Sequence, residues 1–289
     1  MMTPRAPVAE QLIAELRSYH RPVVAFSGGV DSAVVARAAF EADRSTALAV
    51  TSIGPAVAES ERAIARDVAG GIGIEHIELP TDEWRNPSYV RNAPDRCFHC
   101  KSELYGAIRR WLEAHGMADR EIVSGTNVDD LGDFRPGLEA ARDFAVRHPL
   151  VACGLTKPQV RDLARLWGIP VWNKPAAPCL ASRVAYGVEV SPERLLRIER
   201  AESLLRELGF RIVRVRLHAD ELARIEVPRE DIPTLIDRLD QSAVERLKEL
   251  GFRRVTVDLE GFRSGNLNDL VPVDVLSQSV AKPAGGRDT

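Results

Sequence analysis

In the first part of the chain, segments with the apolar pattern of strands alternate with segments with the apolar pattern of helices. Short runs of β-branched and other apolar residues predict buried strands over residues 22–26, 46–52, 74–79 and 121–125. Between them, apolar residues at helical spacing predict helices over residues 7–19, 31–42, 56–71, 101–116 and 157–170. Strands that alternate with helices predict an α/β fold with a doubly wound parallel sheet, whose ligands bind at the carboxyl ends of the strands.

The pattern changes after residue 188. A predicted helix over 192–208 is followed by strands over 210–218 and 222–228, helical sequence within 230–250, and a strand over 252–259. This α-β-β-α-β order predicts a small α+β domain over residues 189–271, after a first domain over residues 1–188. Residues 272–289 are small or polar without a period, and we expect a disordered tail there.

Composition narrows the class of protein. The length of 289 residues agrees with two domains. The 39 Lys and Arg residues and 42 Asp and Glu residues give a net charge of −3, which argues against nucleic-acid or membrane partners. With no long apolar run and no recognisable secretory signal, we expect a cytoplasmic protein. The four cysteines are too few for a disulfide scaffold and favour metal binding or catalysis.

The stretch SGGVDS, residues 27–32, lies between a predicted strand and a predicted helix. Gly28 and Gly29 permit a close backbone approach, so that successive N–H groups and the helix N-terminus can bind phosphates. Ser27 and Ser32 add hydroxyl groups, and Asp31 is suited to Mg²⁺ or a basic partner. The lysine of the common P-loop is absent from the stretch. The alternative is an ordinary glycine turn capped by serine or aspartate.

The cysteines have several possible roles. Cys97 and Cys100 form a C-x-x-C pair after a proline-rich stretch, which is unusual for a redox pair, and no second pair completes a zinc site. A three-cysteine iron–sulfur site with Cys179 as the third ligand is a further possibility. Cys179 can also be a small buried residue in a turn. Cys153 has apolar neighbours and is predicted to be structural.

Four segments of the chain together resemble the LarE family, in the PP-loop ATP pyrophosphatase superfamily. They are SGGVDS, SGTNVDDLGDFRPGLEAA (124–141), GLTKPQVRDLARLWGIPVWNKPAAPCLASR (154–183) and GFRSGNLND (261–269), and the likeness runs over about residues 5–270. The resemblance implies an ATP-dependent sulfur transferase that serves the nickel-pincer nucleotide cofactor of lactate racemase. It also implies homo-oligomers, often hexamers, whereas the sulfide donor stays unknown.

The implied reaction begins when ATP, with Mg²⁺, adenylylates a carboxylate of pyridinium-3,5-biscarboxylic acid mononucleotide. Sulfur then displaces AMP and leaves a thiocarboxylate. In one form of the family the cysteine that matches Cys179 gives up its own sulfur. In the other form a 4Fe–4S cluster, here with Cys97, Cys100 and Cys179 as ligands, holds the sulfide that is transferred. The C-x-x-C pair matches the second form, with Cys179 and Asp31 as the catalytic residues.

The resemblance also implies further site residues. Asn127, Asp129 and Asp130 lie after a strand and are expected to contact nucleotide or metal, with loop capping as the alternative. Residues on the second half of the chain are expected to bind the substrate and its phosphate: Ser182, Arg183, Glu202, Arg214 and Arg216. Arg214 and Arg216 alternate on one predicted strand and therefore share a face, although a solvated strand face explains them equally well.

Three other functions fit part of the sequence. An amide synthetase that uses ammonia shares the PP-loop but needs no C-x-x-C pair with a distant third cysteine. A tRNA thiolase combines a PP-loop with cysteines, but needs a basic RNA-binding surface that the net charge does not favour. A nucleotide-binding regulatory module would bind ATP without forming AMP.

Overall fold

The computed structural model describes residues 6–132 and 136–263, which divide into two compact units. The first unit contains the chain up to Glu83 and residues 97–177. The second contains residues 84–96 and the chain from Pro178 onward. The boundary predicted from sequence, after residue 188, thus differs from the division by contacts. The predicted tail, 272–289, lies outside the described residues.

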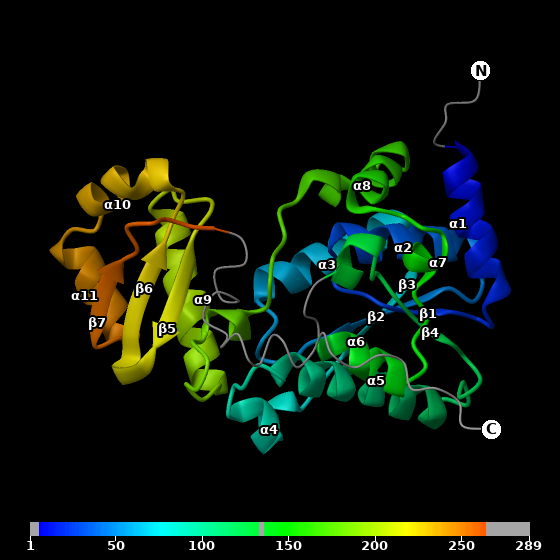
Figure 1. Cartoon of the computed structure of the whole chain (residues 1–289), viewed down its shortest axis with the longest axis horizontal. Coiled ribbons are helices and arrows are strands. Elements are labelled where there is room, and N and C mark those ends of the chain that lie inside the picture. The colour runs from blue at the N-terminus through cyan, green and yellow to red at the C-terminus, as the bar shows by residue number, and fades with distance from the viewer. Residues whose placement is uncertain (1–5, 133–135, 264–289) are drawn as a thin grey trace. The chain divides into compact units, whose positions relative to one another are not determined.

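The first unit contains a parallel sheet of four strands in the order β3-β2-β1-β4. The strands are β1 (Val23–Ala25), β2 (Leu48–Ser52), β3 (Glu75–Leu79) and β4 (Ile122–Ser124). Helices α1 (Ala6–Ser18), α2 (Val30–Ala42), α3 (Glu59–Ile72) and α8 (Lys157–Leu166) cover one face, as Figure 1 shows. Helices α5 (Arg96–Ala114) and α6 (Pro136–Asp143) cover the other face, and the short α7 (Pro149–Ala152) follows.

Two apolar cores lie on the two faces of this sheet. Val24 on β1 and Val123 on β4 belong to the core shared with α1, α2, α3 and α8. Their neighbours Val23 and Ile122 belong to the core shared with α5 and α6. Successive strand residues point to opposite faces, so short strands of entirely apolar residues fill both cores. The predicted doubly wound α/β fold is confirmed.

The second unit contains a three-stranded sheet in the order β5-β6-β7. Strands β5 (Arg214–His218) and β6 (Leu222–Glu226) are antiparallel, whereas β7 (Arg254–Val257) is parallel to β6. Its helices are α4 (Pro87–Val90), α9 (Pro192–Glu207), α10 (Ile232–Arg238) and α11 (Gln241–Glu249). The helical sequence predicted within 230–250 therefore forms two helices. None of the described helices is long and apolar enough to cross a membrane.

Candidate active site

The stretch SGGVDS connects β1 to α2 and is enclosed on two sides. Gly28 has a φ of +69°, and a Cβ there would lie 2.7 Å from Cα of Ala65 on α3. Gly125 follows β4, and a Cβ there would lie 2.7 Å from the backbone nitrogen of Ser32 on α2. Both positions therefore require glycine, because α3 and the end of β4 lie directly against this connection.

The hydroxyl groups of the stretch hold its backbone in shape. Ser32 Oγ accepts a hydrogen bond from Ser27 N at 3.2 Å and donates to the carbonyl oxygen of Gly29 at 3.1 Å. Gly29 is the N-cap of α2, so the N–H groups of the first turn have no carbonyl partner within the helix. The arrangement is a strand, a glycine turn and a helix N-terminus, which suits phosphate binding.

Asp31 lies at the centre of a polar network at the carboxyl ends of β1 and β4. Its Oδ1 accepts a hydrogen bond from Asn127 Nδ2 at 3.1 Å, and its Oδ2 forms an ion pair with Lys157 Nζ. Asp129 Oδ2 accepts from the backbone N–H of Lys157 at 2.7 Å, and Asp130 Oδ2 accepts from that of Asn127 at 3.0 Å. Asp129 and Asp130 thus cap backbone groups, as the loop-capping alternative predicts, and each caps a residue whose side chain contacts Asp31.

Lys157 is a candidate residue that the sequence analysis missed. It is the first residue of α8, after Thr156, which forms a capping box with Gln159. The sequence thus indicates a helix start at this position, but nothing local relates Lys157 to Asp31, which lies 126 residues earlier. The folded chain places an ammonium group beside the phosphate loop, although the loop lacks the P-loop lysine.

The four cysteines are free thiols in different surroundings. Cys97 is exposed and Cys100 is partly exposed near the start of α5, where their spacing of three residues places both on one face of the helix. The helix thus starts earlier than predicted, at Arg96 rather than at residue 101. Cys153 packs against the core, and burial raises the pKa of its thiol to about 11. Cys179 is exposed and precedes a short 3-10 helix, Leu180–Arg183.

The thiols fit the expected iron–sulfur ligand set only in part. Two of them share a helix face in the first unit, and the third lies in the second unit. Within residues 6–132 and 136–263, no three His, Cys, Asp or Glu side chains form a group that could hold a metal ion. The donor atoms are of the kind that binds iron, but an assembled ligand set is not present in the described chain.

Two buried glutamates organise the predicted substrate residues of the second unit. Glu202, on α9, accepts from Arg183 Nε at 3.0 Å and from Arg206 at 2.8 Å. Glu226, on β6, forms a two-pronged pair with Arg216, at 3.0 Å for Nε and 3.0 Å for the second nitrogen. No local pattern in the sequence indicates Glu226, because its partner Arg216 lies on the neighbouring strand.

Around Glu202 and Glu226, the second unit places more arginine side chains than carboxylates. Arg224 also contacts Glu226, at 3.0 Å, and Arg214 lies two residues before Arg216 on β5. Burial, and next the nearby Arg183, lower the pKa of Arg214 to about 10. A surplus of partly desolvated guanidinium groups favours an anionic ligand.

Ser182, Arg183 and Arg216 also hold the backbone around Cys179. The carbonyl oxygen of Cys179 accepts from Ser182 Oγ at 2.7 Å and from Arg183 at 2.9 Å. The carbonyl oxygen of Ser182 accepts from Arg216 at 2.9 Å. Three of the predicted substrate residues thus fix the segment from which the exposed thiol projects.

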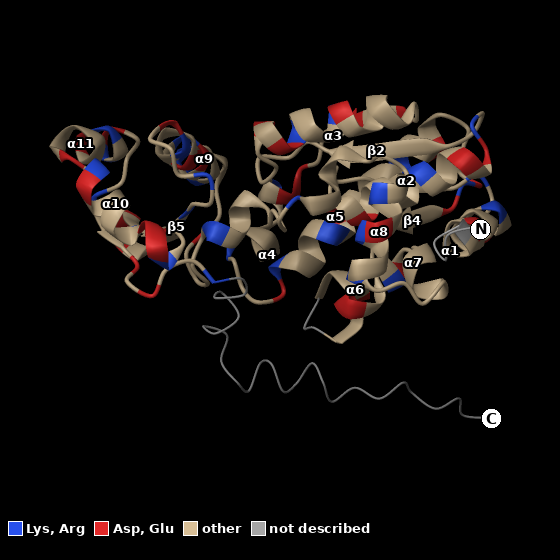
Figure 2. Ribbon diagram, turned by 90° about the horizontal axis from the view of Figure 1, so that it is seen from above, with Lys and Arg blue, Asp and Glu red and all other residues tan. Residues whose placement is uncertain are grey.

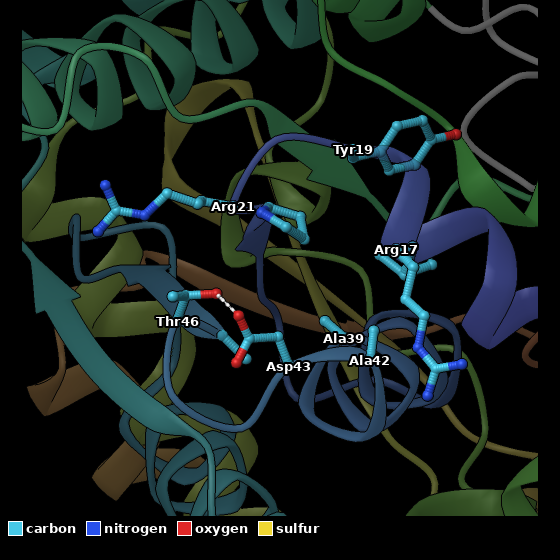
Figure 3. Close-up of a pocket in the computed structure, with 10 residues that line it drawn as sticks. Arg17, Tyr19, Arg21, Ala39, Ala42, Asp43 and Thr46 are labelled. Atoms are coloured by element: carbon cyan, nitrogen blue, oxygen red, sulfur yellow. Dashed lines mark hydrogen bonds between the residues drawn. The ribbon is translucent and has the colours of Figure 1, made fainter.

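A cavity of about 270 Å³ lies at the opposite edge of the first unit, at the amino ends of β1 and β2. Helices α1 and α2 and the chain before β2 line it. Its two arginines, Arg17 and Arg21, extend away from one another, and the carboxylate of Asp43 is bound by Thr46 at 2.8 Å (Figure 3). The cavity has no converging polar groups, so the candidate site is the polar network at the carboxyl ends of the strands.

The chain is similar to several known proteins. The asparagine synthase family matches residues 8–94, which contain the glycine-rich loop. A pyridinium-3,5-bisthiocarboxylic acid mononucleotide synthase from Lactiplantibacillus plantarum is 34% identical over 263 residues, which cover 89% of this chain and 92% of that protein. The uncharacterized protein slr1717 from Synechocystis is 42% identical, over 86% of this chain and 92% of its own. The uncharacterized protein MJ0830 from Methanocaldococcus jannaschii is 27% identical, over 84% and 90%.

Proposed function

Because the chain belongs to the LarE family, we propose that it is an ATP-dependent sulfur transferase of nickel-pincer cofactor biosynthesis. Its substrate is then pyridinium-3,5-biscarboxylic acid mononucleotide, in which carboxylates become thiocarboxylates. The observation that carries the proposal is the similarity to the synthase along nearly all of both chains. The network of Asp31, Asn127 and Lys157 beside a phosphate-binding loop supports it independently.

The first unit supplies the groups for adenylylation. The N-terminus of α2 and the glycine turn bind the β- and γ-phosphates, and Lys157 adds positive charge beside them. Asp31 binds Mg²⁺ once the nucleotide draws Lys157 away from it. A substrate carboxylate oxygen then bonds to the α-phosphorus, the bond to the β-phosphate oxygen breaks, and pyrophosphate leaves with both electrons of that bond.

The second unit supplies the groups for substrate binding and sulfur transfer. Arg183, Arg214 and Arg216, with Ser182 and Glu202, recognise the phosphate and the carboxylates of the nucleotide. A sulfur nucleophile held near Cys179 attacks the activated carbonyl carbon, and AMP leaves with the electrons of the bond between that carbon and the phosphate oxygen. We propose that Cys97, Cys100 and Cys179 ligate a 4Fe–4S cluster, whose remaining iron would carry the sulfide that is transferred. The alternative source is the sulfur of Cys179 itself: its attack forms a thioester, and loss of the Cα proton with cleavage of the Cβ–S bond then releases the thiocarboxylate and leaves dehydroalanine.

The similarity to the synthase supports this activity over the two enzymatic alternatives, the ammonia-using amide synthetase and the tRNA thiolase. The charge distribution also supports it over an RNA-binding enzyme. Acidic and basic residues are interspersed along α3 (Figure 2), where Arg62 and Arg66 both pair with Glu59. A further expectation from family resemblance is a homo-oligomer, often a hexamer, which light scattering of the purified protein measures.

The test incubates anaerobically purified protein with ATP, Mg²⁺ and the pyridinium dicarboxylate nucleotide, and follows pyrophosphate and thiocarboxylate. We expect both products from the wild type, and pyrophosphate alone from Cys179→Ser. Cys153→Ser is the matched control and should retain both. Thiolation by Cys179→Ser at the normal rate would refute the proposal.

Two measurements on the same samples separate the sulfur sources. Broad absorption near ~400 nm that disappears in Cys97→Ala indicates thiolate-bound iron. A protein mass lower by about 34 Da after turnover indicates that Cys179 lost its own sulfur. If the wild-type protein shows no such absorption and does lose that mass, the cluster is contradicted. The proposed sulfur-transferase activity then still stands, with Cys179 as the sulfur source.

A further inference from the structure

Residues 84–96 interrupt the first unit in sequence and belong to the second unit by contacts. Asn92 is completely buried there, with a φ of +55°. Its side-chain nitrogen lies 2.8 Å from the carbonyl oxygen of Ala185 and 2.9 Å from that of Val188, with Val184 at 3.2 Å. The side-chain amide of Asn92 thus contacts three backbone carbonyl groups within residues 184–188, shortly after Cys179 in the chain.

Arg96 extends this contact toward Cys179. Its side chain is buried, at 4% exposure, and the same guanidinium nitrogen donates to Asn92 Oδ1 and, at 2.8 Å, to the carbonyl oxygen of Ala181. Ala181 lies two residues after Cys179. In the chain itself, Arg96 also directly precedes Cys97.

Three arginines therefore bind consecutive parts of the Cys179 segment. Arg183 binds the carbonyl of Cys179, Arg96 that of Ala181, and Arg216 that of Ser182. Arg183 and Arg216 are accounted for by the buried glutamates and the expected substrate site, whereas Arg96 is not. The segment forms one short 3-10 helix, in which the carbonyl oxygens of Cys179 and Ala181 accept from the backbone N–H groups of Ser182 and Val184, at 3.0 and 3.2 Å. The arginine side chains therefore add donors to a segment that has few backbone hydrogen bonds of its own.

We infer that Arg96, oriented by Asn92, is a positioning residue that holds Cys179 in place for sulfur transfer. The inference rests on the proposed function, because it assigns the residue to the second step and not to adenylylation. The rate of transfer depends steeply on the positions of the reacting atoms, and a displacement of about 1 Å can slow the reaction by about 100-fold. A loosened segment should therefore slow thiocarboxylate formation while pyrophosphate release continues.

The test compares Arg96→Met with Arg91→Met in the full-length protein. Arg91 is a matched control, since it lies on the same stretch but is exposed and pairs only with Asp95, at 2.7 Å, among the contacts described. In Arg96→Met we expect faster amide hydrogen exchange within residues 178–190, unchanged exchange in α9, and a roughly 100-fold slower thiocarboxylate step at normal pyrophosphate release. Arg91→Met should match the wild type in all three.

Arg96→Lys retains one donor for the Ala181 carbonyl, and we expect it to restore part of both the protection and the thiolation rate. Wild-type exchange within residues 178–190 in Arg96→Met would overturn the inference. So would faster exchange throughout the protein, or equal loss of pyrophosphate release and thiolation, since both indicate a general structural role. If the wild type forms no thiocarboxylate, the proposed function fails and with it the role in sulfur transfer, whereas the exchange arm still decides whether Arg96 holds the segment.

Discussion

Replacement of Gly28 by alanine tests the packing of the phosphate loop most directly. Its φ of +69° is in the left-handed region, where a side chain costs roughly 1–2 kcal/mol. The new Cβ would also lie 2.7 Å from Cα and 2.9 Å from Cβ of Ala65, an overlap whose relief costs about 1–3 kcal/mol. Together these effects should lower the free energy of unfolding by roughly 2–5 kcal/mol.

Gly29→Ala is the matched control one residue later. Gly29 has a φ of −78°, which any residue adopts, and a Cβ there meets only Ser27 Oγ, at 3.4 Å. As an N-cap change from glycine it should cost less than about 1 kcal/mol. Urea denaturation of the two variants measures the difference, and ATP binding by calorimetry should be lost in Gly28→Ala. Equal unfolding free energies for Gly28→Ala and Gly29→Ala would show that α3 does not confine the loop.

Three further outcomes are expected. Lys157→Met should slow pyrophosphate release by about 100-fold, because a cation beside the phosphates is lost, with little effect on unfolding, since the Lys157–Asp31 pair is partly exposed; release at the wild-type rate would contradict this role. Arg216→Met leaves the fully buried Glu226 with Arg224 as its remaining arginine, and should lower the free energy of unfolding by about 3–5 kcal/mol. Urea denaturation measures this change, and a decrease within the error of the measurement would contradict the prediction. Burial raises the pKa of Cys153 to about 11, so the thiolate forms only as the pH rises toward that value, and its alkylation, mapped by peptide mass, should keep accelerating up to about pH 11; a plateau near pH 9 would contradict the burial.

The sequence determined the local elements and the chemistry that they carry. Apolar runs such as residues 22–26 defined strands because each residue of a short parallel strand contacts one of two cores. The sequence also predicted a phosphate-binding loop at residues 27–32, because glycines between a strand and a helix are a local signal. The start of α5 was placed too late, because Pro87 and Pro94 interrupt the apolar pattern just before it.

Only the tertiary structure decided which distant residues meet. Lys157 reaches Asp31 because α8 packs beside α2, and no local pattern encodes that contact. Asn92 and Arg96 join the second unit because their side chains satisfy carbonyl groups about 90 residues further along the chain. Periodicity reports how a segment folds on itself, whereas ion pairs and buried hydrogen bonds depend on the partners that packing brings together.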